Sequence, residues 1–456
     1  MKIFITKAAL LLSMVSVCSC EQMLDINPPQ NEMVTDQVFE DPQTANAALE
    51  NLYYRLWNNS ILSGAANGMG AVLGSYADDF DCYYSSNNGG MELYLNQPLP
   101  TNPMIEKMWN SSYQIIYAAN LMIEKTDAST GIPQANKDLI KGEALFIRTL
   151  LYFYLQQLFD EIPYTVSTDY IYNSQVEKLT KTELLNKAEA DLVLAVSLLK
   201  DNYRNSNRIY PNRKVAQLLL AKVYLLNGKW AAAEEQCRTV LQFPGYQFEN
   251  NLQDVFHHTG THILWQLAPQ YAGQSTQEAP FFYFENSAPN AYAVSAGLFG
   301  VFDAGDLRKT KWIDPVQSQG QVWYRYAKYK NIFDNENEYS VLNRLEEVYF
   351  VLAESLAEQG RTGEALPYLN YTRQRAGLLP LTGTYSRPQL LAELLLEKRK
   401  EFFGESGMRF FDLKRLGRLD DLKMTKPNWQ DFHRTLPLPQ KELVLNPNLN
   451  PQNAGY

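Results

Sequence analysis

Aromatic and planar amide side chains gather in two polar loop segments of the sequence. They are Tyr83, Tyr84, Asn87 and Asn88 in the first segment, and Tyr271, Gln274, Asn290 and Tyr292 in the second. An aromatic ring can stack on the apolar face of a sugar, and a planar amide can hydrogen-bond two neighbouring hydroxyl groups. These residues are therefore candidates for a ligand-binding site, and the alternative is that the tyrosines simply pack on the surface.

Acidic residues gather at Asp78, Asp79 and Asp81, and again over residues 334–338. Two carboxylates can hydrolyse a glycosidic bond only when they flank a cleft at a set separation, which neighbouring positions in a sequence do not establish. The run 334–338 also lacks the glycine and the terminal glutamate of an EF-hand calcium loop. We therefore expect solvated acidic turns here, with no catalytic residue and no metal.

Three histidines, His257, His258 and His262, lie close together, and the last two are four residues apart. Only a helix would point both at one metal, but the Thr-Gly-Thr run over residues 259–261 favours a turn. The motifs HExxH and GxSxG are absent, and no glycine-rich phosphate loop precedes a helix. The sequence therefore predicts a protein without a cofactor and without enzymatic activity.

The composition bounds the class of protein. The chain has 456 residues, a formal net charge of −9 and 45% hydrophobic residues, which is enough for a large core. No basic tract is present, and this argues against nucleic acid as a partner. The 29 tyrosines exceed what a core needs, so a surplus is available for surface recognition.

A helical hairpin over residues 343–377 is the clearest element that could position such loops. Apolar residues recur at helical spacing, Gly360 and Gly377 end the two predicted helices, and Ala353 and Ala365 allow a close approach. This hairpin resembles a tetratricopeptide repeat, and residues 213–243 repeat its pattern. A single hairpin cannot bury its apolar stripe alone, so we expect an array of them.

The sequence predicts alternating helical and irregular segments. Helices are expected at about 41–57, 104–159, 181–243 and 343–403. The segments at about 58–100 and 248–340 are irregular and are the expected ligand loops. Within the second, THILWQLAP, APFFYFEN and VWYRYAKY read as strands or extended segments.

The N-terminus predicts export and lipidation. Lys2 and Lys7 precede an apolar run that is too short to span a bilayer, and the sequence Val-Cys-Ser-Cys then ends at Cys20. These residues resemble a bacterial lipobox, so we expect residues 1–19 to be a signal peptide and Cys20 to carry the lipid; an ordinary secretory signal is the alternative. Cys82 and Cys237 would then remain, either as a disulfide or as free thiols.

A charged run over residues 394–417 is expected to be structural. Its residues Glu397, Arg399, Glu401, Arg409 and Asp412 alternate in sign, and such charges usually support one another as a helix turns back on the core.

Five segments, in order along the mature chain, resemble the SusD/RagB family of bacterial outer-membrane nutrient-binding lipoproteins. They are CEQMLDINPPQ, LYFYLQQLFDEIPY, LEEVYFVLAESLAEQG with LNYTRQRAGL, LLLEKRKEFFGESGMRFFDLKRLG, and the ending LPLPQKELVLNPNLNPQNAGY. The resemblance implies a mostly α fold, in which tetratricopeptide-type hairpins pack against an irregular half with a few short strands. It also implies one domain over residues 20–456.

The function that the resemblance implies is nutrient capture without chemistry. Such proteins are anchored by lipid on the cell surface and form a lid over a SusC-like TonB-dependent transporter. They bind an oligosaccharide and, in some members, a peptide. The matching motifs belong to the helical framework, so no site residue is taken from the family. A peptide-binding member and, from another class, a secreted glycosidase are the alternatives.

Overall fold

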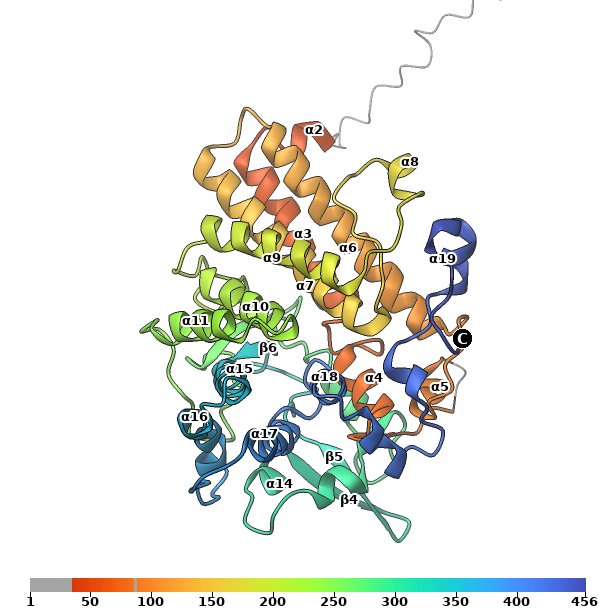
Figure 1. Cartoon of the computed structure of the whole chain (residues 1–456), viewed down its shortest axis with the longest axis vertical. Coiled ribbons are helices and arrows are strands. Elements are labelled where there is room, and N and C mark those ends of the chain that lie inside the picture. The colour runs from red at the N-terminus through yellow and green to blue at the C-terminus, as the bar shows by residue number, and fades with distance from the viewer. Residues whose placement is uncertain (1–34, 86–87) are drawn as a thin grey trace, which may run out of the picture.

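The computed structural model describes residues 35–85 and 88–456. The expectations for residues 1–19, Cys20 and Asn87 lie outside this part of the chain. The described residues form a mostly helical molecule, which confirms the predicted fold class (Figure 1). In Figure 1 the long helices fill the top and the left side, and β4 and β5 lie at the bottom.

The long helices fall in the four ranges that the sequence predicts. They are α3 (Pro42–Asn59), α6 (Pro103–Ala128), α7 (Gln134–Phe159), α9 (Lys181–Leu198), α10 (Arg213–Leu226), α11 (Trp230–Leu241), α15 (Leu345–Glu358), α16 (Thr362–Arg375) and α17 (Arg387–Phe402). Helix α7 is buried on all sides from Gly142 to its end because α6 and α9 pack against it, and α3 and α10 also contact it.

The two predicted hairpins are confirmed as α15–α16 and α10–α11, each pair packed together. Gly360 and Gly228 follow the first helix of each pair with φ of +78° and +70°, a backbone conformation that glycine adopts without strain. Ala353 and Ala365 are fully buried, as close helix packing requires.

Two small antiparallel sheets complete the fold. The larger has the order β1-β3-β5-β4, and the smaller pairs β2 with β6. Their strands are β1 (Phe80–Cys82), β2 (Ile263–Leu267), β3 (Tyr292–Val294), β4 (Ile313–Ser318), β5 (Gln321–Tyr326) and β6 (Ser340–Arg344).

Two of the three predicted strands are confirmed, as β2 and β5. The third prediction, APFFYFEN, is wrong in its first half, which forms the short helix α12 (Ala279–Phe282). Pro280 fits the first turn of a helix, and the three-residue spacing of Ala279 and Phe282 puts both side chains into the core.

Short helical segments connect these elements. They are α2 (Thr35–Val38), α4 (Met69–Tyr76), α5 (Gly90–Tyr94), α8 (Tyr170–Asn173), α13 (Ala296–Gly300), α14 (Arg308–Lys311), α18 (Met408–Arg415), α19 (Gln440–Leu445), η3 (Leu419–Met424), η4 (Asp431–Arg434) and η5 (Pro447–Leu449). Within the described residues, every helix is too short or too polar to cross a membrane.

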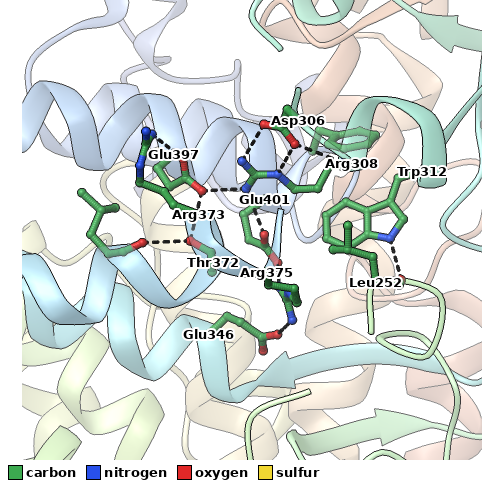
Figure 2. Close-up of polar contacts among 12 residues, drawn as sticks. Leu252, Asp306, Arg308, Trp312, Glu346, Thr372, Arg373, Arg375, Glu397 and Glu401 are labelled. Carbon is green, nitrogen blue, oxygen red and sulfur yellow. Dashed lines mark hydrogen bonds and ion pairs between the residues drawn. The ribbon is translucent and has the colours of Figure 1, made fainter. Parts of the chain in front are cut away.

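A buried ionic network joins the helical half to the sheet half (Figure 2). Glu401 of α17 accepts hydrogen bonds from Arg308 of α14 at 3.1 Å and from Arg344 of β6 at 2.6 Å. Glu397 likewise binds Arg308, at 2.7 Å. The expectation that the charged run is structural agrees with these contacts. Glu397, Arg399, Glu401 and Arg409 pair with residues outside the run. Asp412 pairs within it, with Lys398 at 2.6 Å and Arg415 at 2.8 Å.

Candidate functional site

One face of the larger sheet turns away from the core and carries both aromatic and charged side chains. The register pairs Asp81 with Ala293, Asp314 with Arg325, and Val316 with Trp323. Successive residues of a strand point to opposite sides, so these side chains share one face while Phe80, Tyr292 and Tyr326 fill the core behind it. We call the outward side of β1, β3, β5 and β4 the sheet face.

Tyr83 brings the two predicted ligand loops together on the sheet face. Its backbone N–H donates to the Ala291 carbonyl oxygen at 2.8 Å and so extends the pairing of β1 with β3. Tyr83 is 36% exposed, and its hydroxyl group lies near Trp323, which is half-buried against Phe284 and Val316. Burial and the nearby Asp81 raise the pKa of Tyr83, so its hydroxyl stays neutral and able to donate.

Charged groups flank this aromatic pair on both sides. Asp81 accepts a hydrogen bond from the Tyr94 hydroxyl at 3.1 Å. On the other side, Arg325 donates to Asp314 at 2.8 Å, and its guanidinium lies 5.0 Å from the Tyr283 ring centroid. Two rings beside carboxylates and a guanidinium make a surface that can stack on a sugar and hydrogen-bond its hydroxyls.

Tyr84 and Tyr292 support the surface from behind. Their rings meet edge to face with centroids 5.2 Å apart, and burial raises the pKa of Tyr84 to about 12. Tyr292 is fully buried and packs on Phe282. The expectation that Tyr292 offers its ring to a ligand is therefore wrong, because β3 points that side chain into the core.

Two of the predicted amides take different positions. Asn88 is half-buried, and its side-chain oxygen accepts from the Gly90 N–H at 3.0 Å, so it stabilises the start of α5. Asn290 is exposed and precedes Ala291, the backbone partner of Tyr83. Asn290 therefore stays a candidate ligand contact at the edge of the sheet face.

Tyr271 and Gln274 do not join this group. The Gln274 side-chain oxygen accepts from the backbone N–H groups of Gln270 and Tyr271, at 3.1 and 3.2 Å, and closes a turn. This turn pairs with Asn335 through Gly273. Tyr271 is 66% exposed, and in the described residues it shares no hydrogen bond or ring contact with Tyr83 or Trp323.

The expectation of a solvated turn is wrong for Asp78 and Asp79, which form buried ionic contacts instead. Arg409 donates to the Asp78 carboxylate at 2.8 Å, and Arg399 donates to that of Asp79 at 2.9 Å. Burial disfavours the ionised form of Asp78, but Arg399 and Arg409 outweigh it and lower its pKa. The turn prediction is wrong because both arginines lie more than 300 residues away in the chain.

The second acidic run is also partly buried. Glu338 accepts from the backbone N–H groups of Lys330 and Asn331, at 3.0 and 3.1 Å, and Asn335 is buried beside it. Its carboxylate is therefore occupied in shaping the loop, and the expectation of a solvated turn is wrong for Glu338.

The histidines and cysteines have structural surroundings. The Nε2 atom of His262 lies 2.9 Å from the Val255 carbonyl oxygen, and His258 stacks on Tyr339. Across residues 35–85 and 88–456, no group of three or more His, Cys, Asp or Glu side chains converges as a metal site. Cys82 and Cys237 are both buried free thiols, which settles the alternative that the sequence left open.

Sequence reasoning missed Trp323 and Arg325. Both lie in VWYRYAKY, a segment that the sequence predicts as a strand. The strand period of two separates Trp323 and Arg325 from Tyr324 and Tyr326, and this alternation could have placed the first pair on an open face.

Comparisons with known proteins agree with this architecture. Residues 23–225 match a family model described as starch-binding associating with outer membrane, and residues 310–456 match a model described as the SusD family. SusD-like protein P2 of Formosa agariphila is 27% identical over an alignment that covers 78% of this chain and 81% of the relative.

Solved structures show the same fold. A SusD superfamily protein from Bacteroides vulgatus superposes with a TM-score of 0.79 at 20% identity, covering 92% of this chain and all of that one. Surface glycan-binding protein A from Bacteroides thetaiotaomicron, solved with laminarihexaose, gives 0.76 at 18% identity and covers 90% of this chain and 99% of its own.

Proposed function

This chain belongs to the SusD/RagB family, and on that premise we propose that it is a cell-surface lipoprotein that binds an oligosaccharide on its sheet face. It hands the ligand to a SusC-like TonB-dependent transporter in the outer membrane and leaves the ligand chemically unchanged. The observation that carries this proposal is the exposed Tyr83 beside Trp323 at the junction of the two ligand loops.

The polar surroundings of the two rings suit a sugar. Asp81 and Asp314 can accept hydrogen bonds from hydroxyl groups, and Arg325 can donate to them. Hydrogen bonds from Tyr94 to Asp81 and from Arg325 to Asp314 already hold these side chains, so less conformational entropy is lost when a ligand binds. The relative with a bound laminarihexaose supports a β-glucan as the first ligand to try.

The anchor and the transporter partnership rest on other observations. The description of the first family model, associating with outer membrane, supports the location. The lipobox-like residues before Cys20 support lipidation, and acyl chains contribute roughly 0.8 kcal/mol of membrane affinity per buried CH₂.

Calorimetric titration of the chain without residues 1–20 tests the binding site. Tyr83→Ala and Trp323→Ala should each weaken laminarihexaose binding by about five- to tenfold, because an aromatic stacking contact is lost. Tyr172→Ala is a matched control, since Tyr172 is 59% exposed on α8 and lies away from the sheet face. Unchanged binding of neutral glycans by both variants would refute the site.

One observation favours the peptide alternative. Asp81 and Asp314 give the sheet face two carboxylates against the one guanidinium of Arg325, an acidic balance that would also suit a basic peptide. Titration with a lysine-rich peptide and with laminarihexaose, side by side, separates the two ligands. Binding of the peptide alone, lost in Trp323→Ala, would replace the glycan in the proposal.

The glycosidase alternative is disfavoured by the ionic contacts of the clustered carboxylates. Asp78 and Asp79 are buried and held by Arg409 and Arg399, so neither can approach a substrate. Release of reducing sugar from laminarin by the purified protein, abolished by Asp79→Asn, would restore this alternative.

A further inference from the structure

A polar cavity of about 440 Å³ lies in the helical half, apart from the sheet face. It is lined by residues of α9, α10, α11, α15 and α18, together with the end of α7 and η4. The proposed function assigns no role to this cavity, so the partners of each polar group in its wall are informative.

Two carboxylates of the wall are already neutralised. Glu354 forms a two-pronged ion pair with Arg415, at 2.6 Å for each hydrogen bond. Glu358 pairs with Arg387 at 2.5 Å. These acidic groups therefore leave no charge for a ligand to compensate.

Within the described residues, three cations of the wall form no direct ion pair, although Asp160 acts on Lys414 and Asp431 acts on Arg434 at longer range. Lys181, Lys414 and Arg434 form no ion pair with any carboxylate in the part of the chain that the structure describes, and Asp160 is the one further acidic residue of the wall. Lys414 is largely enclosed, and its Nζ donates to the Gln157 carbonyl oxygen at 2.5 Å. The cavity therefore holds an excess of positive charge in a protein whose net charge is −9.

Two further features of the wall point to a hydroxylated ligand with an apolar face. Gln156 is only 2% exposed, and its buried side-chain oxygen accepts no hydrogen bond from the described residues. A buried acceptor without a hydrogen-bond donor lowers the stability of the folded protein by about 1–3 kcal/mol. A ligand hydroxyl that donates to this oxygen would remove that loss. Trp230, 36% exposed, offers an aromatic surface in the same wall.

We propose that this cavity binds the carboxylate-bearing ring of an acidic sugar, a hexuronate, as a second glycan site in the helical half. One such ring brings an anion for the three cations, hydroxyl groups for Gln156 and an apolar face for Trp230. The choice of a sugar as occupant rests on the proposed function. An acidic peptide would satisfy the cations but would bring no apolar ring face to stack on Trp230.

Exposed residues of the wall allow a test that leaves the fold intact. Lys181→Gln with Arg434→Gln removes two exposed cations and should weaken trigalacturonate or trimannuronate binding by about tenfold, as two partly exposed ion pairs would. Lys107→Gln with Lys200→Gln is the matched control, because both lysines are exposed and lie outside the cavity wall. Calorimetry at low salt provides the readout.

The pH dependence gives a second, independent readout. Burial lowers the pKa of Lys414 to about 8; Asp160 raises it, while Lys181 and Arg434 lower it further. The remaining charged groups of the wall, Glu354, Glu358 and Arg415, are paired. Hexuronate affinity should therefore fall between pH 7 and pH 9 as Lys414 loses its proton.

Lys414→Gln should bind hexuronate more weakly and show no such fall. An unchanged fall in this variant would overturn the role of Lys414.

The outcomes separate this site from the sheet face. Uronate binding that weakens in the double variant but not in the control supports the cavity, and unchanged laminarihexaose binding in that variant shows that the sheet face is a different site. The inference is overturned if the wild-type protein binds neither trigalacturonate nor trimannuronate. It is also overturned if the protein binds an acidic hexapeptide but neither of these sugars. Loss of laminarihexaose binding in Trp323→Ala bears only on the proposed function.

Discussion

Glu401 is the carboxylate with the most arginine partners in the buried ionic network (Figure 2). Its neutralisation should therefore lower the free energy of unfolding. The network contains five cations and five carboxylates, which are Arg308, Lys328, Arg344, Arg373 and Arg375 with Asp306, Glu346, Glu397, Glu401 and Glu405. Glu401→Gln keeps the shape of the side chain but leaves one buried cation uncompensated. Breaking a buried ion pair on one side costs about 3–5 kcal/mol.

We therefore expect Glu401→Gln to lower the free energy of unfolding by about 3–5 kcal/mol. The measurement is urea unfolding of the chain without residues 1–20, followed by both tryptophan fluorescence and circular dichroism. Asp420→Asn is the control, because Asp420 pairs with Lys423 while its side chain is 73% exposed, and we expect it to change little. A loss below about 1 kcal/mol in Glu401→Gln, the range of exposed ion pairs, would refute the reasoning.

The pH dependence of stability checks the same argument. Burial opposes ionisation of Glu401, but Arg375, Arg344 and Arg308 outweigh it and hold its pKa well below the usual range. A depressed pKa contributes stability above the unfolded-state pKa of about 4.3, and this contribution is lost as the pH falls. The wild type should thus lose stability more steeply than Glu401→Gln below about pH 4.3.

Three further predictions follow from single residues. Gly407 has a φ of +67°, and an added Cβ would lie 2.5 Å from a leucine side-chain carbon, so Gly407→Ala should lower the melting temperature. Gly363→Ala is the control and should not lower it, because the space around Gly363 is open. Cys82 and Cys237 are buried, so the chain without residues 1–20 should react with a thiol reagent only after unfolding; fast reaction in the native state would contradict this burial. Cys20→Ala should move the protein from the membrane fraction to the soluble fraction or leave it as precursor, and unchanged fractionation would contradict the anchor.

The sequence predicts the helical framework well because its signals are local. Helical periodicity and the glycines at 228, 360 and 377 define the hairpins without any knowledge of distant contacts. The burial of Asp78 and Asp79 depends instead on arginines that lie more than 300 residues later in the chain. No local pattern distinguishes such carboxylates from those of a solvated turn.

The candidate site was predicted only in part, for a related reason. The loop composition singled out Tyr83 as a candidate, and in the structure segments from both irregular regions meet beside it. Composition alone does not say which tyrosine faces outward, because Tyr84 and Tyr292 have the same chemistry as Tyr83 but point toward the core. Only the strand register separates them.

The ionic contacts of Asp78 and Asp79 connect the helical framework to the sheet face. Asp79 directly precedes β1, and α17 and α18 hold the turn through Arg399 and Arg409. The same turn binds the segment after β3, since the Ser295 hydroxyl and N–H donate to the carbonyl oxygens of Asp78 and Asp79.

Two strands of the sheet are thereby fixed where they leave the core, only a few residues from the exposed aromatic ring of Tyr83. A ligand that stacks on this ring meets a surface that is ordered before binding, because buried charge pairs of the helical half hold the strand that carries it. Neutralising Asp79 should therefore weaken glycan binding even though the side chain never reaches the ligand. The loss should appear in affinity at an unchanged number of sites, which calorimetry distinguishes from loss of folded protein.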